Sequence, residues 1–146
     1  AVLAEYLVGG LDAQRLRLLA GRVVAAHALI EGASFVDCYR TLNKTFGFKQ
    51  KVAFSITTRT YRGGGLTKDA IYLRGLMAML DYLQKGRDLM PLFVGKISAG
   101  HLPIIEELKF RQILVQPPLR PRYLDDLETE ERLAAIKNHL SVIDLL

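Results

Sequence analysis

Apolar side chains recur every three to four positions along most of the chain, the spacing that places them on one face of an α-helix. This pattern predicts helices over residues 1–8, 13–31, 35–46, 49–61, 68–84, 89–96, 101–114 and 126–146. A strand is an alternative around Ile56, Thr57 and Thr58, because β-branched side chains lose rotamer freedom in a helix. Strand-like alternation is otherwise nearly absent. We therefore expect an all-α fold, an irregular bundle of about six to eight helices with a Gly-rich turn and a Pro-rich strap.

Capping residues support these boundaries. Asp12, Ser34 and Thr67 stand where an N-cap side chain accepts a backbone N–H group. Glycines follow the expected helix ends at Gly9, Gly32, Gly47 and Gly86. Gly75 falls inside the apolar face expected for residues 68–84, with Ile71 one turn before it, and this predicts close approach of another helix. Prolines between residues 116 and 123 predict the extended strap, with an SH3-type ligand as the alternative.

Composition narrows the classes of protein that fit. A length of 146 residues suits one helical domain over 1–146, and a hydrophobic fraction of 50% excludes a disordered chain. The net charge of +5 permits an anionic partner, but plain solubility is the preferred interpretation. No run of five like charges provides a tail for nucleic acid, and no apolar run reaches the length of a membrane span. We expect neither nucleic acid nor membrane as a partner.

The lone cysteine and the first residues suggest the setting of the chain. Cys38 cannot form an internal disulfide, which suits a reducing compartment, and we expect a cytoplasmic protein with a partly buried thiol. The first residues lack the basic region of a signal peptide. Because the chain begins without Met in mid-pattern, we expect a C-terminal fragment of a longer protein. A cut helix exposes apolar surface, so self-association is also expected.

Residues 59–69, named the glycine turn below, concentrate the candidate binding chemistry. Arg59, Arg62 and Lys68 surround the consecutive glycines Gly63, Gly64 and Gly65. Bare backbone followed by a helix N-terminus favours a carboxylate or phosphate, which arginine grips with a bidentate fork. The spacing matches neither a Walker A loop nor a dinucleotide fingerprint. The alternative is a tight interhelical turn whose arginines pair with Asp69 or Asp81.

The three histidines do not have the spacing of a metal site. His27 falls on the apolar stripe of residues 13–31 and is best interpreted as a core or boundary histidine. His101 is best interpreted as a capping or surface residue, and His139 stands apart from both. A zinc-binding helix needs two ligands one turn apart, so no metal ligand is assigned within this chain.

Three segments resemble the bacterial QEGLA-motif proteins, also called flavohemoglobin-expression-modulating proteins. The matching segments are RTYRGGGLTKDAIYLRGL at 59–76, PLFVGK at 91–96 and PPLRPRYL at 117–124. Residues 1–7 look like the segment that directly follows Gln-Glu-Gly-Leu in that family. The resemblance implies a relation to the microtubule-associated tyrosine carboxypeptidases, zinc metallopeptidases that remove a C-terminal tyrosine from tubulin.

The resemblance also implies a zinc cofactor, and it implies that the metal ligands and the substrate-side lobe lie in different parts of the full-length protein. The family's zinc motif, His-Glu-x-x-x-His with the glutamate of Gln-Glu-Gly-Leu, does not occur in this sequence. Zinc is therefore expected in the full-length protein, with ligands upstream of Ala1, and none in this fragment, which alone should be inactive. The chain would form the C-terminal, substrate-side lobe of a zinc-dependent carboxypeptidase-like enzyme whose partner is a peptide or protein C-terminus.

Residue chemistry then suggests roles within that lobe. A carboxypeptidase must bind a free carboxylate and stabilise an oxyanion. Arg59 or Arg62, with Lys68, is expected to bind the carboxylate, and Gly63, Gly64 and Gly65 to offer backbone N–H groups. Tyr61 or Tyr72 is expected to contact the oxyanion or the substrate side chain. The alternative functions are a non-enzymatic helical binding or regulatory module and, ranked last because the arginines are spread out, nucleic-acid binding.

Overall fold

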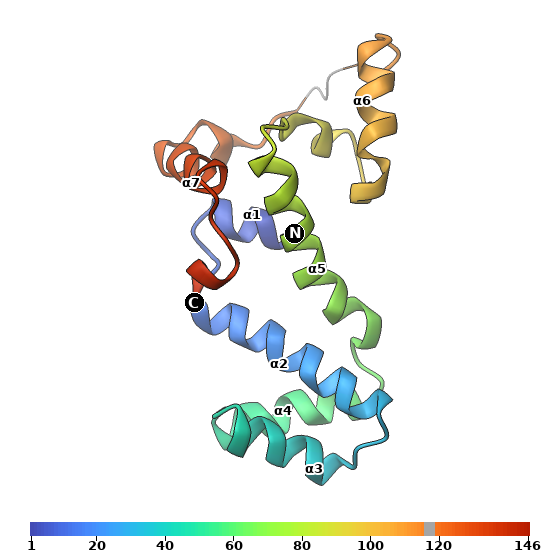
Figure 1. The fold of residues 1–146 in the computed structure, drawn as a ribbon, viewed down its shortest axis with the longest axis vertical. Coiled ribbons are helices and arrows are strands. Elements are labelled where there is room, and N and C mark those ends of the chain that lie inside the picture. Colours follow the sequence, from blue (N-terminus) through green and yellow to red (C-terminus); the bar gives the residue numbers. More distant parts are fainter. Residues whose placement is uncertain (116–118) are drawn as a thin grey trace. The chain divides into compact units, whose positions relative to one another are not determined.

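The computed structural model of the protein describes residues 1–115 and 119–146 (Figure 1). Within these ranges the chain forms only helices, which confirms the all-α fold, and the strand alternative at residues 56–58 is wrong. The seven α-helices of the described ranges are α1 (Val2–Leu7), α2 (Ala13–Ile30), α3 (Phe35–Arg40), α4 (Gln50–Tyr61), α5 (Leu66–Gln84), α6 (Leu102–Phe110) and α7 (Leu127–Lys137). A π-helical turn, η1 (Thr41–Thr45), extends α3, and the 3₁₀ segments are η2 (Met90–Phe93), η3 (Ala99–His101), η4 (Arg122–Asp125) and η5 (Ile143–Leu145).

The chain divides into two compact units, each described here by itself. One unit comprises residues 1–11 and 75–144, and the other comprises residues 12–74 and 145–146. Helix α5 contributes residues to both units. The expectation of a single domain over 1–146 stays a prediction.

Caps and a small core define the unit of residues 12–74. The Asp12 carboxylate accepts a hydrogen bond from the Arg15 amide at 2.6 Å, and the Ser34 hydroxyl accepts one from the Asp37 amide at 3.2 Å. These bonds satisfy N–H groups that have no partner inside their own helices. Helices α2 and α3 both pack against α4. The buried core between them consists of Ala25, Cys38, Leu42, Ala53 and Ile56.

The buried face of α2 includes Leu16 and Leu19, as the apolar spacing predicts, but beyond them it is made of small residues and departs from the expected face. Gly21, Ala25 and Ala26 are buried, whereas His27 is exposed and Ile30 is 73% exposed. The interpretation of His27 as a core or boundary residue is therefore wrong. Small residues lie inward because they allow α2 and α4 to approach closely.

Close helix approach occurs at Gly21 and not at Gly75. A Cβ atom on Gly21 would lie 2.7 Å from the Phe48 ring and 3.2 Å from Ile56. Gly75 is exposed, and within the described part of the chain no atom lies within 4 Å of a Cβ placed there. Ile71, expected on the same buried face, is 60% exposed. The prediction of a helix contact at Gly75 is therefore wrong.

The unit of residues 1–11 and 75–144 joins segments distant in sequence. Helix α1 packs against α7. The Leu7 carbonyl at the end of α1 accepts hydrogen bonds from the Thr129 hydroxyl and from Arg132, both at 3.0 Å. Thr129 is 1% exposed, so its hydroxyl must find a partner inside the protein. These two bonds satisfy one of the carbonyls that α1 leaves without a helical partner.

Several element boundaries differ from the predicted ones. Helix α6 ends at Phe110 instead of continuing to 114, and α7 ends at Lys137 instead of 146. Helix α5 begins at Leu66, so Thr67 lies within its first turn and is not its N-cap. The strap expected at 116–123 lies partly outside the described residues.

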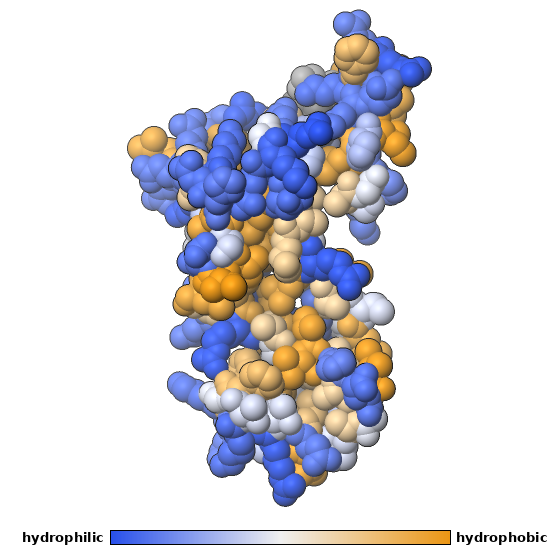
Figure 2. Space-filling model, in the orientation of Figure 1, coloured by the Kyte–Doolittle hydropathy of each residue, from blue (hydrophilic) through white to orange (hydrophobic). Residues whose placement is uncertain are grey.

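Large apolar side chains reach the surface at several places. In Figure 2, orange side chains lie among blue ones on the visible face. Phe110 and Val115 are 84% and 87% exposed. Self-association through such residues stays a prediction. In the described ranges, none of the helices combines the length and the apolar character needed to cross a membrane.

Candidate functional site

The glycine turn begins with a hydrogen-bonded helix end. The Gly63 amide donates to the Thr60 carbonyl at 2.9 Å, and the Gly64 amide donates to the Arg59 carbonyl at 2.8 Å. This pair of bonds is the Schellman motif, which requires a left-handed residue, and Gly63 supplies it with φ of 82°. The amides of Gly63 and Gly64 therefore already have acceptors. In this turn, the N–H groups left without an intrahelical acceptor are those of the first turn of α5.

An ion pair ties the end of α4 to the start of α5. Arg59 Nη1 donates to Asp69 Oδ2 at 2.6 Å, and Nη2 donates to Oδ1 at 3.2 Å. The same Nη1 atom donates to the Gly64 carbonyl at 2.8 Å. The side chain of Asp69 is 2% exposed and that of Arg59 is 34% exposed. Arg22 Nη1 lies 3.9 Å from Asp69 Oδ1. Pairing with Asp69, one alternative for the arginines of this turn, is thus confirmed for Arg59.

Gly65 provides the space for this ion pair. A Cβ atom at Gly65 would lie 1.9 Å from Arg59 Nη1 and 2.2 Å from Asp69 Oδ2. Its φ of 83° also lies in the left-handed region. Any side chain at this position would therefore displace the bidentate pair.

Arg62 and Lys68 are the exposed cations of the glycine turn. Arg62 is the C-cap of α4, and Lys68 lies in the first turn of α5. Neither forms an ion pair with any residue in 1–115 or 119–146. Both side chains are exposed, and Lys68 lies at the positive end of the α5 dipole. This arrangement suits a carboxylate or another small anion.

The two candidate tyrosines have different surroundings. The Tyr61 hydroxyl donates to the backbone carbonyls of Ala33 and Ser34, the latter at 3.1 Å. Burial raises the pKa of Tyr61, and the nearby Cys38 and Asp37 raise it further. Tyr61 thus ties α4 to the loop before α3. Tyr72 lies half-buried on α5.

Cys38 is a structural residue by its surroundings. It is 1% exposed, and the Thr57 hydroxyl lies 3.9 Å from its sulfur. Burial raises the pKa of the thiol, which disfavours the nucleophilic thiolate. The thiol is therefore more deeply buried than the partly buried one that the sequence predicts.

A cavity of about 320 Å³ lies between side chains of α5 and α6 and the segments joined to them. We call it the charged cavity, because Asp81, Lys85, Arg87 and Glu106 line it together with Tyr82. The Tyr82 hydroxyl donates to Glu106 Oε1 at 3.1 Å, and Arg87 Nη1 donates to Glu106 Oε2 at 3.1 Å. Sequence reasoning did not group these residues into a site, and it proposed a role only for Asp81, as an alternative partner for the arginines of the glycine turn. The spacing of Asp81 and Lys85, one helical turn apart, is the only part of the set that a sequence pattern reveals.

Tyr82 provides a test of this cavity's geometry. Burial raises the pKa of its phenol to about 12, and the hydrogen bond to Glu106 adds to the shift. Because the pKa in the folded protein exceeds the ordinary 10.0, stability linked to this phenol is complete below pH 10 and is lost as pH rises towards 12. We expect that Tyr82→Phe removes a high-pH step from the ultraviolet absorbance titration of the phenolates. Loss of a step near pH 10 instead would contradict the buried contact.

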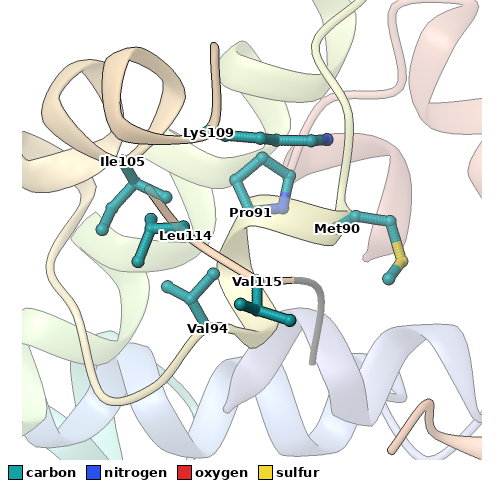
Figure 3. A pocket seen from close by; sticks show the side chains of 7 residues that line it. All are labelled: Met90, Pro91, Val94, Ile105, Lys109, Leu114 and Val115. Carbon is teal, nitrogen blue, oxygen red and sulfur yellow. The ribbon is translucent and has the colours of Figure 1, made fainter. Parts of the chain in front are cut away.

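A second cavity is too small for an organic ligand. Its volume is about 20 Å³, room for roughly one water molecule. Figure 3 shows the side chains that line it, with Pro91 and Val94 facing Ile105 and Leu114. The lining is almost entirely apolar, with Lys109 passing over Pro91 (Figure 3). We interpret it as imperfect packing between η2 and α6.

The residues present do not fit a zinc ion. Over residues 1–115 and 119–146, no three His, Cys, Asp or Glu side chains gather into a set that could hold a metal. His101 Nδ1 accepts a hydrogen bond from the Ser98 amide at 3.4 Å, which confirms its capping role. His27 and His139 are exposed. No step that depends on zinc is therefore assigned to these residues.

Comparison with known protein families gives a match over nearly the whole chain. The family model of the microtubule-associated tyrosine carboxypeptidase matches residues 1–141. No curated protein and no solved structure matches the chain. The match covers the glycine turn, the charged cavity and all seven helices described above. The chain therefore belongs to the microtubule-associated tyrosine carboxypeptidase family.

Proposed function

We propose that this chain is the C-terminal, substrate-side lobe of a zinc-dependent carboxypeptidase-like peptidase, and that Arg62 and Lys68 bind the C-terminal carboxylate of a peptide or protein. The observation that carries the proposal is the presence of two exposed cations in the glycine turn that form no ion pair within the described ranges, Arg62 at the end of α4 and Lys68 in the first turn of α5. Family membership supplies the reaction class. Zinc enters through the family resemblance alone, held by residues outside these 146.

Arg59 has a positioning role in this proposal. Asp69 already neutralises its guanidinium, and both terminal nitrogens already donate to the Asp69 carboxylate oxygens. A substrate carboxylate would have to compete with that buried partner. Arg62 and Lys68 have no such competitor in the described chain, so they provide the stronger electrostatic attraction. The Arg59–Asp69 pair then fixes the conformation of the turn that contains both cations.

Backbone and phenol groups complete the proposed site. The first-turn N–H groups of α5 point out of the helix start and add partial positive charge. Among the glycines, Gly65 directly precedes α5, whereas Gly63 and Gly64 have amides that close the end of α4. Tyr72 is the better oxyanion or side-chain contact of the two tyrosines, because the Tyr61 hydroxyl donates to backbone carbonyls. The buried lone thiol suits a cytoplasmic setting.

The test uses the protein that carries this chain together with its metal-binding residues. Arg62→Ala and Lys68→Ala are each expected to lower kcat/KM for peptide cleavage by roughly 10-fold to 100-fold, the usual loss for a charge-assisted hydrogen bond. The preference for a free C-terminal acid over a C-terminal amide should fall in parallel. Arg74→Ala is the matched control, since Arg74 is another exposed cation of α5.

Two outcomes would overturn the proposal. Unchanged kcat/KM and unchanged acid preference in both variants would show that these cations do not bind substrate. An intact protein without stoichiometric zinc would favour the alternative, a non-enzymatic helical binding or regulatory module.

A further inference from the structure

The charged cavity has a chemistry of its own that points to a second ligand. We propose that it binds a free α-amino acid with an apolar side chain. None of the residues that line it belongs to the glycine turn, so this site goes beyond the proposed carboxypeptidase function and does not rest on it.

The apolar part of the lining selects an apolar group of limited size. It consists of Ala78 and Met79 of α5, Ala99, and Leu102 and Pro103 of α6. Leu102 is only 4% exposed, so this part of the lining includes the packed interior of the unit. A volume of about 320 Å³ lies at the small end of ligand sites, about 300–1,000 Å³. It accommodates a single amino acid better than a stretch of peptide.

The lining also includes two cations and two anions, paired with one another. Lys85 Nζ lies 2.6 Å from Asp81 Oδ2, and Arg87 Nη1 lies 3.1 Å from Glu106 Oε2. Three of the four side chains are more than half exposed, and Glu106 is 32% exposed. Ion pairs of this kind are screened and contribute little to stability. They can therefore exchange partners at low cost when a charged ligand enters.

A zwitterion is the ligand that leaves none of these charges without a partner. Its carboxylate can take over Arg87 and Lys85 while its ammonium group takes over Glu106 and Asp81. A simple anion would separate the cations from their acidic partners and leave two carboxylates uncompensated. A simple amine would do the reverse. Either ligand would lose two pairings that a zwitterion keeps, so both are expected to bind more weakly.

Glu106 is the best-oriented polar group of the cavity. Tyr82 donates to Oε1, while Arg87 donates to Oε2. If Arg87 turns towards a ligand carboxylate, the Tyr82 bond still holds Glu106 in place. The Oε2 atom then becomes free to accept from a ligand ammonium group. Tyr82 thus acts as a positioning residue for the ammonium subsite.

Binding to the unmodified chain tests the ligand class. We expect L-leucine to bind with a Kd on the order of 1 mM or tighter, followed by NMR chemical-shift changes or by calorimetry. 3-Methylbutylamine lacks the carboxylate of leucine, and 4-methylpentanoate lacks its ammonium group. Each is expected to bind about 10-fold more weakly, and glycine, which lacks the apolar group, equally so. Affinity for either analogue equal to that for leucine, or no leucine binding at about 10 mM, overturns the proposal.

Variants then place the binding at this cavity. Arg87→Gln and Glu106→Gln are each expected to weaken leucine binding about 10-fold. Arg111→Gln is the matched control, because Arg111 forms an exposed pair with Glu107 at 2.6 Å and does not line the cavity. Circular dichroism verifies that each variant is folded. Leucine binding that both cavity variants leave unchanged also overturns the proposal.

Discussion

Replacing Gly65 with alanine is expected to lower the free energy of unfolding by about 3–4 kcal/mol, the largest single effect that the glycine turn predicts. Alanine in the left-handed conformation, which Gly65 adopts with φ of 83°, costs about 1–2 kcal/mol. The added Cβ would also lie 1.9 Å from Arg59 Nη1, which is too close for both atoms to keep their positions. The ion pair with Asp69 must then open, and leaving that buried carboxylate unpaired adds about 2 kcal/mol.

Gly63→Ala separates the two contributions. Gly63 has nearly the same φ, 82°, but among the described atoms none lies within 4 Å of a Cβ placed there. We expect the backbone cost alone, about 1–2 kcal/mol. Urea-induced unfolding followed by circular dichroism measures both variants. Equal losses at the two positions would mean that the space beside Gly65 is not filled by the ion pair.

Helix ends were predictable where glycine occupies the left-handed position, and unpredictable where another residue does. Gly9, Gly32 and Gly63 each close a helix with the amide bonds of a Schellman motif. Helices α6 and α7 end in the same way, but with Gln112 at φ of 58° and His139 at φ of 65°. Both residues are strained there, and neither signals a helix end in the sequence. The apolar pattern continues beyond them, so both helices were predicted too long.

The second half of the contact face of α2 was missed for a different reason. Periodicity gives weight to large apolar side chains, and it selected a stripe that includes Ile30 and His27. The structure instead turns Gly21, Ala25 and Ala26 inward. Small residues permit close packing of backbones and contribute little to a hydropathy pattern. A stripe of small residues is therefore easily overlooked when larger apolar ones lie on the neighbouring face.

The two candidate sites differ in how much the sequence could reveal. The glycine turn is contiguous in sequence, so its cations and its acidic partner Asp69 could be identified together, with pairing as one alternative. The charged cavity combines Tyr82 with Glu106, 24 residues later, and only folding brings them within 3.1 Å. No local spacing rule covers such a distance along the chain. Contact between separate helices is the information that sequence reasoning lacked.

Asp69→Asn is expected to destabilise the unit of residues 12–74 by about 2–3 kcal/mol. The substitution keeps the size of the side chain and removes its charge. Two guanidinium groups, those of Arg59 and Arg22, would then face each other without the carboxylate between them. This loss is smaller than the roughly 3–5 kcal/mol expected when one partner of a fully buried ion pair is removed, because Arg59 is 34% exposed and can turn towards water.

Asp81→Asn is the matched control for this loss. Asp81 lies on the same helix and pairs with Lys85 at 2.6 Å, but its side chain is 61% exposed. Its replacement is expected to change the free energy of unfolding by no more than about 0.5 kcal/mol. Raising the salt concentration should weaken the Asp81 pair and leave most of the Asp69 contribution in place. Equal effects of the two substitutions would contradict the buried position of Asp69.

A double-mutant cycle with Arg59→Gln distinguishes the ion pair from packing. The two side chains share two hydrogen bonds, so their substitutions should be strongly non-additive, with a coupling of about 1–3 kcal/mol. Additive losses would mean that each side chain stabilises the turn separately. Coupling also bears on the proposed function, because Arg62 and Lys68 lie on the segment that this pair holds in place. If these two cations bind the substrate carboxylate as proposed, Asp69→Asn should also weaken the preference for a free C-terminal acid.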